Sequence, residues 1–244
     1  MMRDSYHKIF SETGRILVVM AHPDDNEIVC GGTVARLIDD DKKVRVVVMT
    51  NGGKGTKDRT DISEGQFAKI RVEEQRRAGK ELGLKDEEMF NLGIPDGELE
   101  ESIDNIKKIV FHIRQFKPEI IITHNPEVHI NSFSKGIHWV NHRDHRHTAS
   151  LVLDAAYPYS RDTAFFPDQL ENGLGPHSVG KFLLSDSYTH PDICGLEVSG
   201  YLDKRRKALE QHVNGLSKEE VNGLMEEIQR DGGNFELLRY IDTD

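Results

Sequence analysis

Short apolar runs alternate with longer amphipathic segments along most of the chain, and this alternation constrains the fold more than any other feature. The apolar runs predict buried strands at residues 16–21, 44–50, 89–92, 120–123 and 181–184. The segments between and after them predict helices at residues 27–40, 64–84, 103–116, 145–156, 201–212 and 219–229. Repeated alternation of strand and helix is typical of a parallel sheet covered by helices. We therefore expect an α/β fold with a Rossmann-like, mostly parallel β-sheet and helices on both faces.

The chain shows no sign of a division into separate units. Its 244 residues contain no internal repeat and no linker-like stretch, so we expect a single domain over residues 1–244. One segment, residues 125–141, has no clear periodicity and is expected to be a long loop. Such a loop in a compact domain is usually functional or mobile.

The composition limits the kinds of partner and compartment. Against 42 acidic residues stand 32 basic ones, and the net charge of −10 offers no electrostatic footprint for nucleic acid or an anionic membrane. No apolar run approaches the roughly 20 residues that a membrane-spanning helix needs. Residues 1–11 are polar and lack the apolar core of a signal peptide. We therefore expect a soluble, cytoplasmic protein without a nucleic-acid or membrane partner.

The first predicted strand ends in a sequence that suits metal binding. Ligands of open α/β sheets gather outside the carboxyl ends of the strands, and His22 and Asp25 follow the first strand directly. An imidazole and a carboxylate three residues apart could both face one zinc ion. Asp24 and Glu27 also match a capping box, which is the structural alternative. No glycine-rich phosphate-binding motif follows this strand, which argues against a nucleotide cofactor.

A third ligand would have to come from a distant segment, and residues 142–147 (HRDHRH) are the candidate. His142 and His145 have helical i, i+3 spacing, and Asp144 between them could orient an imidazole. A solvent-exposed, charged helix start is the alternative. The two cysteines, Cys30 and Cys194, lie outside any Cys-x-x-Cys pair, so the sequence excludes a disulfide framework and an all-thiolate zinc site.

These motifs together resemble the PIG-L/LmbE-type zinc-dependent N-deacetylases, which remove the acetyl group from N-acetylglucosamine derivatives. The matching segments are AHPDDNE at 21–27, GGT at 31–33, TNG at 50–52, IRxxE at 70–74, HxDH at 142–145, SYTH at 187–190 and LxKxxxALxxH at 202–212. The resemblance covers about residues 14–213. Residues 49–56 and 188–190 look most like the diacetylchitobiose deacetylase branch of the family.

The resemblance implies a role for each residue of the two motifs. Three residues would be the Zn²⁺ ligands: His22, Asp25 and His145. Asp24 would be the general base, and His142, oriented by Asp144, would assist as an electrostatic or acid partner. A carboxylate held between two ligand positions is well placed to take a proton from water.

Two further residues match positions that resemble contacts to sugar hydroxyls, Arg71 and Asp96. Their structural alternatives are an ion pair of Arg71 with Glu74 and a plain turn at residues 95–97. The sequence also departs from the family: Gly53 stands where an acid is common, and residues 212–215 (HVNG) alter the family's His-x-Ser-Gln pattern.

We therefore predict a zinc-dependent hydrolase that deacetylates a neutral N-acetylglucosamine unit in a monosaccharide, a disaccharide or a small conjugate. Trp139 is the single tryptophan and the obvious platform for stacking a sugar. The branch resemblance also implies a homo-oligomer, such as a hexamer. The alternatives are an N-deacetylase or amide hydrolase of another secondary metabolite, and a non-catalytic Rossmann-type metal-binding protein.

Overall fold

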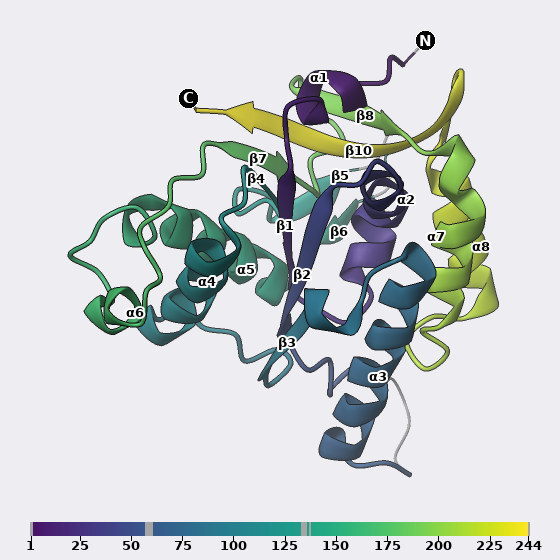
Figure 1. The fold of residues 1–244 in the computed structure, drawn as a ribbon. Coiled ribbons are helices and arrows are strands. Elements are labelled where there is room, and N and C mark those ends of the chain that lie inside the picture. The colour runs from purple at the N-terminus through teal and green to yellow at the C-terminus, as the bar shows by residue number, and fades with distance from the viewer. Residues whose placement is uncertain (1, 57–60, 133–135, 137, 244) are drawn as a thin grey trace.

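A computed structural model describes residues 2–56, 61–132, 136 and 138–243 of the chain (Figure 1). The main sheet has the strand order β3-β2-β1-β4-β7-β10-β8. Its strands are β1 (Arg15–Met20), β2 (Lys43–Thr50), β3 (Met89–Ile94), β4 (Ile120–Thr123), β7 (Lys181–Leu184), β8 (Ile193–Glu197) and β10 (Gly233–Asp242), with the short β9 (Gln229–Arg230) beside β10. The first five strands in this order pair in parallel, and β10 pairs antiparallel with β7 and β8. The predicted α/β fold with a mostly parallel sheet is confirmed.

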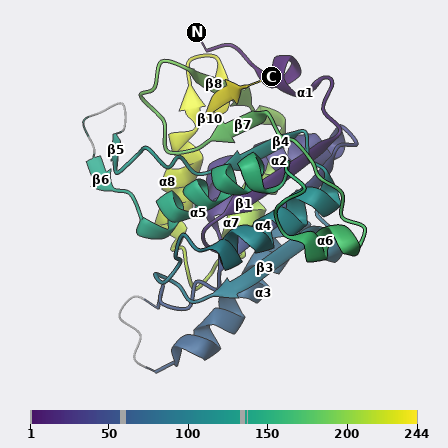
Figure 2. The ribbon, with the colours of Figure 1, turned by 90° about the vertical axis from the view of Figure 1, so that its left-hand side faces the viewer.

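Helices cover both faces of this sheet (Figures 1 and 2). One face carries α1 (Tyr6–Phe10), α2 (Asp25–Asp39), α3 (Glu64–Leu82), α7 (Leu202–Glu210) and α8 (Lys218–Glu227). The other carries α4 (Ile103–Phe116), α5 (Arg143–Asp154) and α6 (Pro167–Glu171). Because successive side chains of a strand point to opposite faces, Ile16 and Val18 of β1 pack in one core cluster and Leu17 and Val19 in the other.

The predicted strands and helices are all present, with ends shifted by a few residues. The prediction of a long loop at residues 125–141 is wrong in part, because β5 (Ile130–Ser132) and β6 (His138–Val140) form an antiparallel hairpin there. Strands β8 and β10 were not predicted either, and they pair with each other although they are far apart in the sequence. Such pairing leaves no local periodicity from which it could be read.

The fold brings the start of α2 to the carboxyl ends of the strands. Helix α2 begins directly after β1, and the Thr50 hydroxyl donates to the Ala21 carbonyl at 2.9 Å, which joins the ends of β1 and β2. A Cβ on Gly32 would lie 2.7 Å from Val198 Cβ, so α2 packs this closely only with glycine there. Within the described ranges, none of the helices has the length and apolar character needed to cross a membrane.

Candidate metal and catalytic site

Three side chains converge beyond the end of β1: His22 from the β1–α2 turn, Asp25 from the first turn of α2, and His145 from the first turn of α5. Each offers one ligand atom, and these atoms all lie within 4.8 Å of one another. Asp25 Oδ2 lies 3.4 Å from His22 Nδ1, and its Oδ1 lies 3.3 Å from His145 Nε2. Two imidazoles and one carboxylate around one point are a donor set typical of catalytic zinc sites, which leave a coordination position open.

A second pair of residues, His124 and Asp186, stands behind these three and was not predicted. His124 Nε2 lies 3.3 Å from Asp25 Oδ2, and His124 Nδ1 lies 3.2 Å from Asp186 Oδ2. Its ring stacks on that of His145 with the centroids 3.9 Å apart. Burial lowers the pKa of His124, but contacts with Asp186 and Asp25 outweigh it and raise the pKa to about 9. His124 therefore holds the Asp25 carboxylate and the His145 ring in place, and Asp186 in turn holds His124.

A sequence signal for both residues existed. His124 follows β4 directly, and Asp186 comes two residues after the end of β7. Since β4 and β7 are parallel neighbours, their carboxyl ends meet at the same edge of the sheet. The strand-end position thus points to His124 and Asp186 as it does to the first motif, although neither was assigned a role from the sequence.

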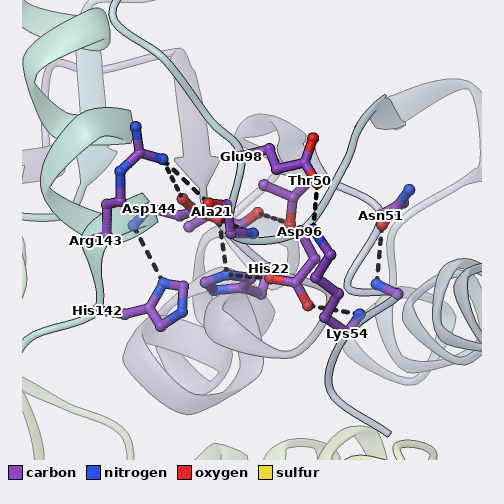
Figure 3. Close-up of polar contacts among 12 residues, drawn as sticks. Ala21, His22, Thr50, Asn51, Lys54, Asp96, Glu98, His142, Arg143 and Asp144 are labelled. Atoms are coloured by element: carbon purple, nitrogen blue, oxygen red, sulfur yellow. Dashed lines mark hydrogen bonds and ion pairs between the residues drawn. The ribbon is translucent and has the colours of Figure 1, made fainter. Parts of the chain in front are cut away.

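On the other side of the site, His22 faces two more carboxylates (Figure 3). His22 Nε2 lies 3.3 Å from Asp96 Oδ1 and 3.5 Å from Asp144 Oδ2. Asp96 also accepts a hydrogen bond from the backbone N–H of Lys54 at 3.0 Å, and Asp144 accepts one from that of Gly97 at 2.7 Å. The turn at residues 95–97 therefore reaches into the candidate site, and Asp96 is brought to the predicted metal ligands.

His142 lies in the site, but its relation to Asp144 differs from the prediction. The backbone N–H of Asp144 donates to His142 Nδ1 at 3.1 Å, whereas the Asp144 carboxylate faces His22 (Figure 3). The ring of His142 packs edge-on against His22, with centroids 4.6 Å apart. Burial, His22 and His145 lower the pKa of His142. The neighbouring imidazoles thus oppose the protonated His142 that the sequence analysis expected.

Asp24 is buried next to the three converging residues without being one of them. Its backbone has φ +140, and its side chain makes no capping hydrogen bond to α2. The capping-box alternative is wrong, since Glu27 lies 3.2 Å from His212 instead. Burial raises the pKa of Asp24, and the Arg71 guanidinium opposes this shift. A buried carboxylate with a raised pKa is suited to accepting and returning a proton.

Arg71 reaches Asp24 from α3. Its Nη2 lies 2.9 Å from Asp24 Oδ2 and donates to the Pro23 carbonyl, and only 7% of its side chain is exposed. Glu74, the alternative partner, instead accepts hydrogen bonds from Asn214. The structure thus brings together all eight predicted site residues: His22, Asp24, Asp25, Arg71, Asp96, His142, Asp144 and His145.

Known proteins resemble this chain in sequence and in fold. The model of the PIG-L family, described as GlcNAc-PI de-N-acetylase, matches residues 17–156, more than half of the chain. Diacetylchitobiose deacetylase of Thermococcus kodakarensis is 29% identical over 203 residues, which are 83% of this chain and 70% of that protein.

Solved structures with this fold include enzymes of more than one reaction type. N,N'-diacetylchitobiose deacetylase from Pyrococcus horikoshii aligns over 96% of this chain and 86% of its own, with a TM-score of 0.81 and 25% identity. GalB, the 4-carboxy-2-hydroxymuconate hydratase of Pseudomonas putida, aligns over 94% of this chain and 96% of its own, with a TM-score of 0.71 and 15% identity. The second likeness shows the fold alone, but the family match covers the strand-end motif and both histidines of the α5 turn. The chain therefore belongs to the PIG-L family of deacetylases.

Proposed function

We propose that this protein is a zinc-dependent hydrolase that removes the N-acetyl group from a small substrate containing N-acetylglucosamine. The observation that carries the proposal is the convergence of His22, Asp25 and His145 beside Asp24, a buried carboxylate outside the ligand set. A structural zinc site is closed by four protein ligands, whereas three ligands and a nearby acid outside the set suit catalysis.

The donor set fits zinc, because it combines two imidazole nitrogens, from His22 and His145, with the buried carboxylate of Asp25. His22, Asp25 and His145 would hold the ion, with His124 and Asp186 fixing the orientation of the last two. When bound there, zinc would polarise the amide carbonyl and lower the pKa of water from about 15.7 towards 7.

The chain's own groups then move the proton. Asp24 takes it from the attacking water and returns it to the nitrogen of the leaving amine, so the carboxylate is regenerated in each cycle. Arg71 keeps the carboxylate in place through the 2.9 Å contact. His142 is exposed beside His22, and because its Nδ1 accepts from the Asp144 backbone, its Nε2–H would donate a hydrogen bond to the carbonyl oxygen as negative charge develops there.

We propose a neutral, short substrate of one or two sugars. Asp96, and the part of Arg71 that its partners leave accessible, would bind ring hydroxyls, and Trp139 would stack on a sugar. Trp139 is 41% exposed on β6. A cavity of about 320 Å³ lies between β5, with the chain before it, and the segment after β7. Asp186 lines this cavity as well as contacting His124, so the cavity adjoins the proposed metal site.

Other members of this family act on different acetylated molecules. A relative in Streptomyces avermitilis is a 1D-myo-inositol 2-acetamido-2-deoxy-alpha-D-glucopyranoside deacetylase. The proposed substrate class includes such conjugates, and an N-deacetylase of another secondary metabolite is the alternative within the same chemistry. We also propose that the protein forms a homo-oligomer such as a hexamer.

Metal analysis followed by an acetate-release assay tests the proposal. The purified chain should contain one zinc per chain and release acetate from N-acetylglucosamine or diacetylchitobiose. Asp24→Asn should keep zinc and lose turnover by about a hundredfold to ten-thousandfold, because an amide cannot accept the proton. Asp25→Asn should lose zinc as well.

The matched pair of variants separates base from ligand. Equal loss of zinc in both would make Asp24 a ligand and the site structural. Full zinc content without acetate release from either sugar or from an N-acetylglucosaminyl conjugate would contradict the proposed substrate class.

A further inference from the structure

Three polar contacts tie the loop between α7 and α8, residues 211–217, to the helices that carry the proposed catalytic groups (Figure 1). His212 Nε2 lies 3.2 Å from Glu27 Oε2 on α2. The backbone N–H and the side-chain amide of Asn214 donate to Glu74 Oε1 on α3, at 3.1 and 2.6 Å. Glu27 and Glu74 are both almost completely buried. The loop is thus fixed to α2 and to α3 on either side of Arg71.

Gly215 of this loop lies directly against the Arg71 guanidinium. A Cβ on Gly215 would stand 1.6 Å from Arg71 Nη1 and 2.8 Å from its Cζ, which no real contact allows. A Cβ on Gly52 would stand 3.4 Å from Arg71 Nε, which is an ordinary van der Waals contact. Gly215 is therefore the glycine whose missing side chain leaves room for the guanidinium.

Gly215 faces Nη1 of the guanidinium, and the other terminal nitrogen, Nη2, contacts Asp24. Asp24 has φ +140, a backbone conformation that costs a non-glycine residue about 1–3 kcal/mol and persists only where its surroundings impose it. The contacts with Arg71 link this strained residue to α3, and through Gly215 to the α7–α8 loop. A shift of the guanidinium would therefore shift the carboxylate.

We propose that the α7–α8 loop is a positioning element, in which Gly215 packs against the Arg71 guanidinium and keeps it in contact with Asp24. This contact positions the Asp24 carboxylate beside the metal ligands. The inference rests on the proposed function for the role of Asp24 as the base. The loop sequence HVNG at 212–215 departs from the family pattern, and glycine is the residue that the contact with Arg71 requires.

Gly215→Ala tests this inference directly. The added methyl group must displace the end of a flexible side chain, so the melting temperature and the zinc content should stay close to those of the wild type. We expect kcat to fall tenfold to a hundredfold, because the displaced guanidinium misplaces the base. Gly223→Ala is the matched control, since a Cβ there meets nothing within 4 Å, and its kcat should equal that of the wild type.

A double-mutant cycle assigns the effect to Arg71. Arg71→Gln removes the three atoms that Gly215 faces, Cζ, Nη1 and Nη2. In this background Gly215→Ala should cause no further loss of kcat, although Arg71→Gln by itself is slow. If the fold-losses of kcat in the two single variants simply multiply in the double variant, the inference is overturned, because Gly215 then acts without Arg71.

A measurement that does not depend on turnover completes the test. In protein labelled with ¹⁵N-arginine, the Nε–H resonance that disappears in Arg71→Gln should shift in Gly215→Ala and stay in place in Gly223→Ala. Asn214→Ala, which loosens the loop without adding bulk, should shift it as well and serves if Gly215→Ala does not fold. An unmoved resonance overturns the inference, whereas a shifted resonance in a protein that releases no acetate would refute the proposed function alone.

Discussion

Among the residues that the structure describes, two arginine–carboxylate pairs lie largely buried, and they differ in how completely their polar atoms are satisfied. Arg205 and Glu236 lie between α7 and β10, away from the candidate site, with side chains at most 1% exposed. Arg71 and Asp24 lie in the site, with side chains 7% and 14% exposed. Both pairs have short contacts, at 3.1 and 2.9 Å, so distance alone does not distinguish them.

The Arg205 pair is surrounded by partners. Arg205 donates to Glu236 and to the carbonyls of Ile28 and Leu224, at 2.8 and 3.0 Å. Glu236 accepts the backbone N–H groups of Gly32 and Thr33, both at 2.8 Å. The pair thereby supplies an acceptor where α2 is kinked at Cys30 and joins α2, α7 and β10. These contacts identify a structural pair.

The pair in the site is less completely satisfied. Arg71 Nε is buried and has no hydrogen-bond partner among the residues that the structure describes, and Asp24 is held in a strained backbone conformation. Unsatisfied groups and strain collect where chemistry requires a group to be available. In this fold, the structural pair differs from the functional pair in whether the surrounding polar atoms all have hydrogen-bond partners.

The largest expected effect is a loss of stability when the Arg205–Glu236 pair is broken. Arg205→Ala should lower the free energy of unfolding by about 3–5 kcal/mol, because it leaves Glu236 and two carbonyls buried without their donor. Chemical denaturation measures this loss. Arg206→Ala is the control, since that neighbouring side chain is 41% exposed and its loss should cost under about 0.5 kcal/mol. A loss in Arg205→Ala no larger than in the control would contradict the assignment.

Replacing each acid by its amide sharpens the comparison. Glu236→Gln should cost about 2–3 kcal/mol, because an amide nitrogen cannot accept from Gly32 or Thr33. Asp24→Asn should lower the free energy of unfolding by less than Glu236→Gln does, because burial already disfavours the charge of Asp24 and raises its pKa, and its side chain caps no backbone N–H of α2. Denaturant unfolding of the two variants side by side decides the matter, and equal costs would remove the distinction between the pairs.

Much of the site could be predicted because its parts are short motifs at strand and helix ends. The turn after β1 carries His22 and Asp25 in one local stretch, and the first turn of α5 carries His145. Local spacing placed these residues, since strands of a parallel sheet end at one edge.

What the sequence did not reveal are contacts between segments far apart in the chain. The pairing of Glu27 with His212 joins residues 185 positions apart, and the role of Asp186 depends on β7 lying next to β4. The orientation of the Asp144 carboxylate towards His22 depends on the turn at Gly97, whose N–H holds it. Of these, only the position of Asp186 just beyond a strand end leaves a local signal in the sequence.

The comparison extends to a further buried ionisable group, which has no oppositely charged partner among the described residues. His112 on α4 is 4% exposed, it packs edge-on against the rings of Phe90 and Phe111, and its Nδ1 has no hydrogen-bond partner within the described ranges. Burial, with a smaller contribution from Arg45, lowers the pKa of His112 to about 4. The unfolded chain binds a proton at this histidine near its ordinary pKa of about 6.5, whereas the folded chain does not until about pH 4.

The smallest expected effect follows from this difference and depends on pH. As pH falls from 7 to 5, the wild type should lose about 2 kcal/mol more of its free energy of unfolding than His112→Phe, which keeps the ring and removes the titration. Because both proteins share every other ionisable group, the difference between their stability curves isolates His112. The curves should converge above pH 7, where the histidine is neutral in both states. Curves that stay parallel from pH 7 to pH 5 would show that a histidine buried without a partner is tolerated here in its charged form, against the argument from satisfaction.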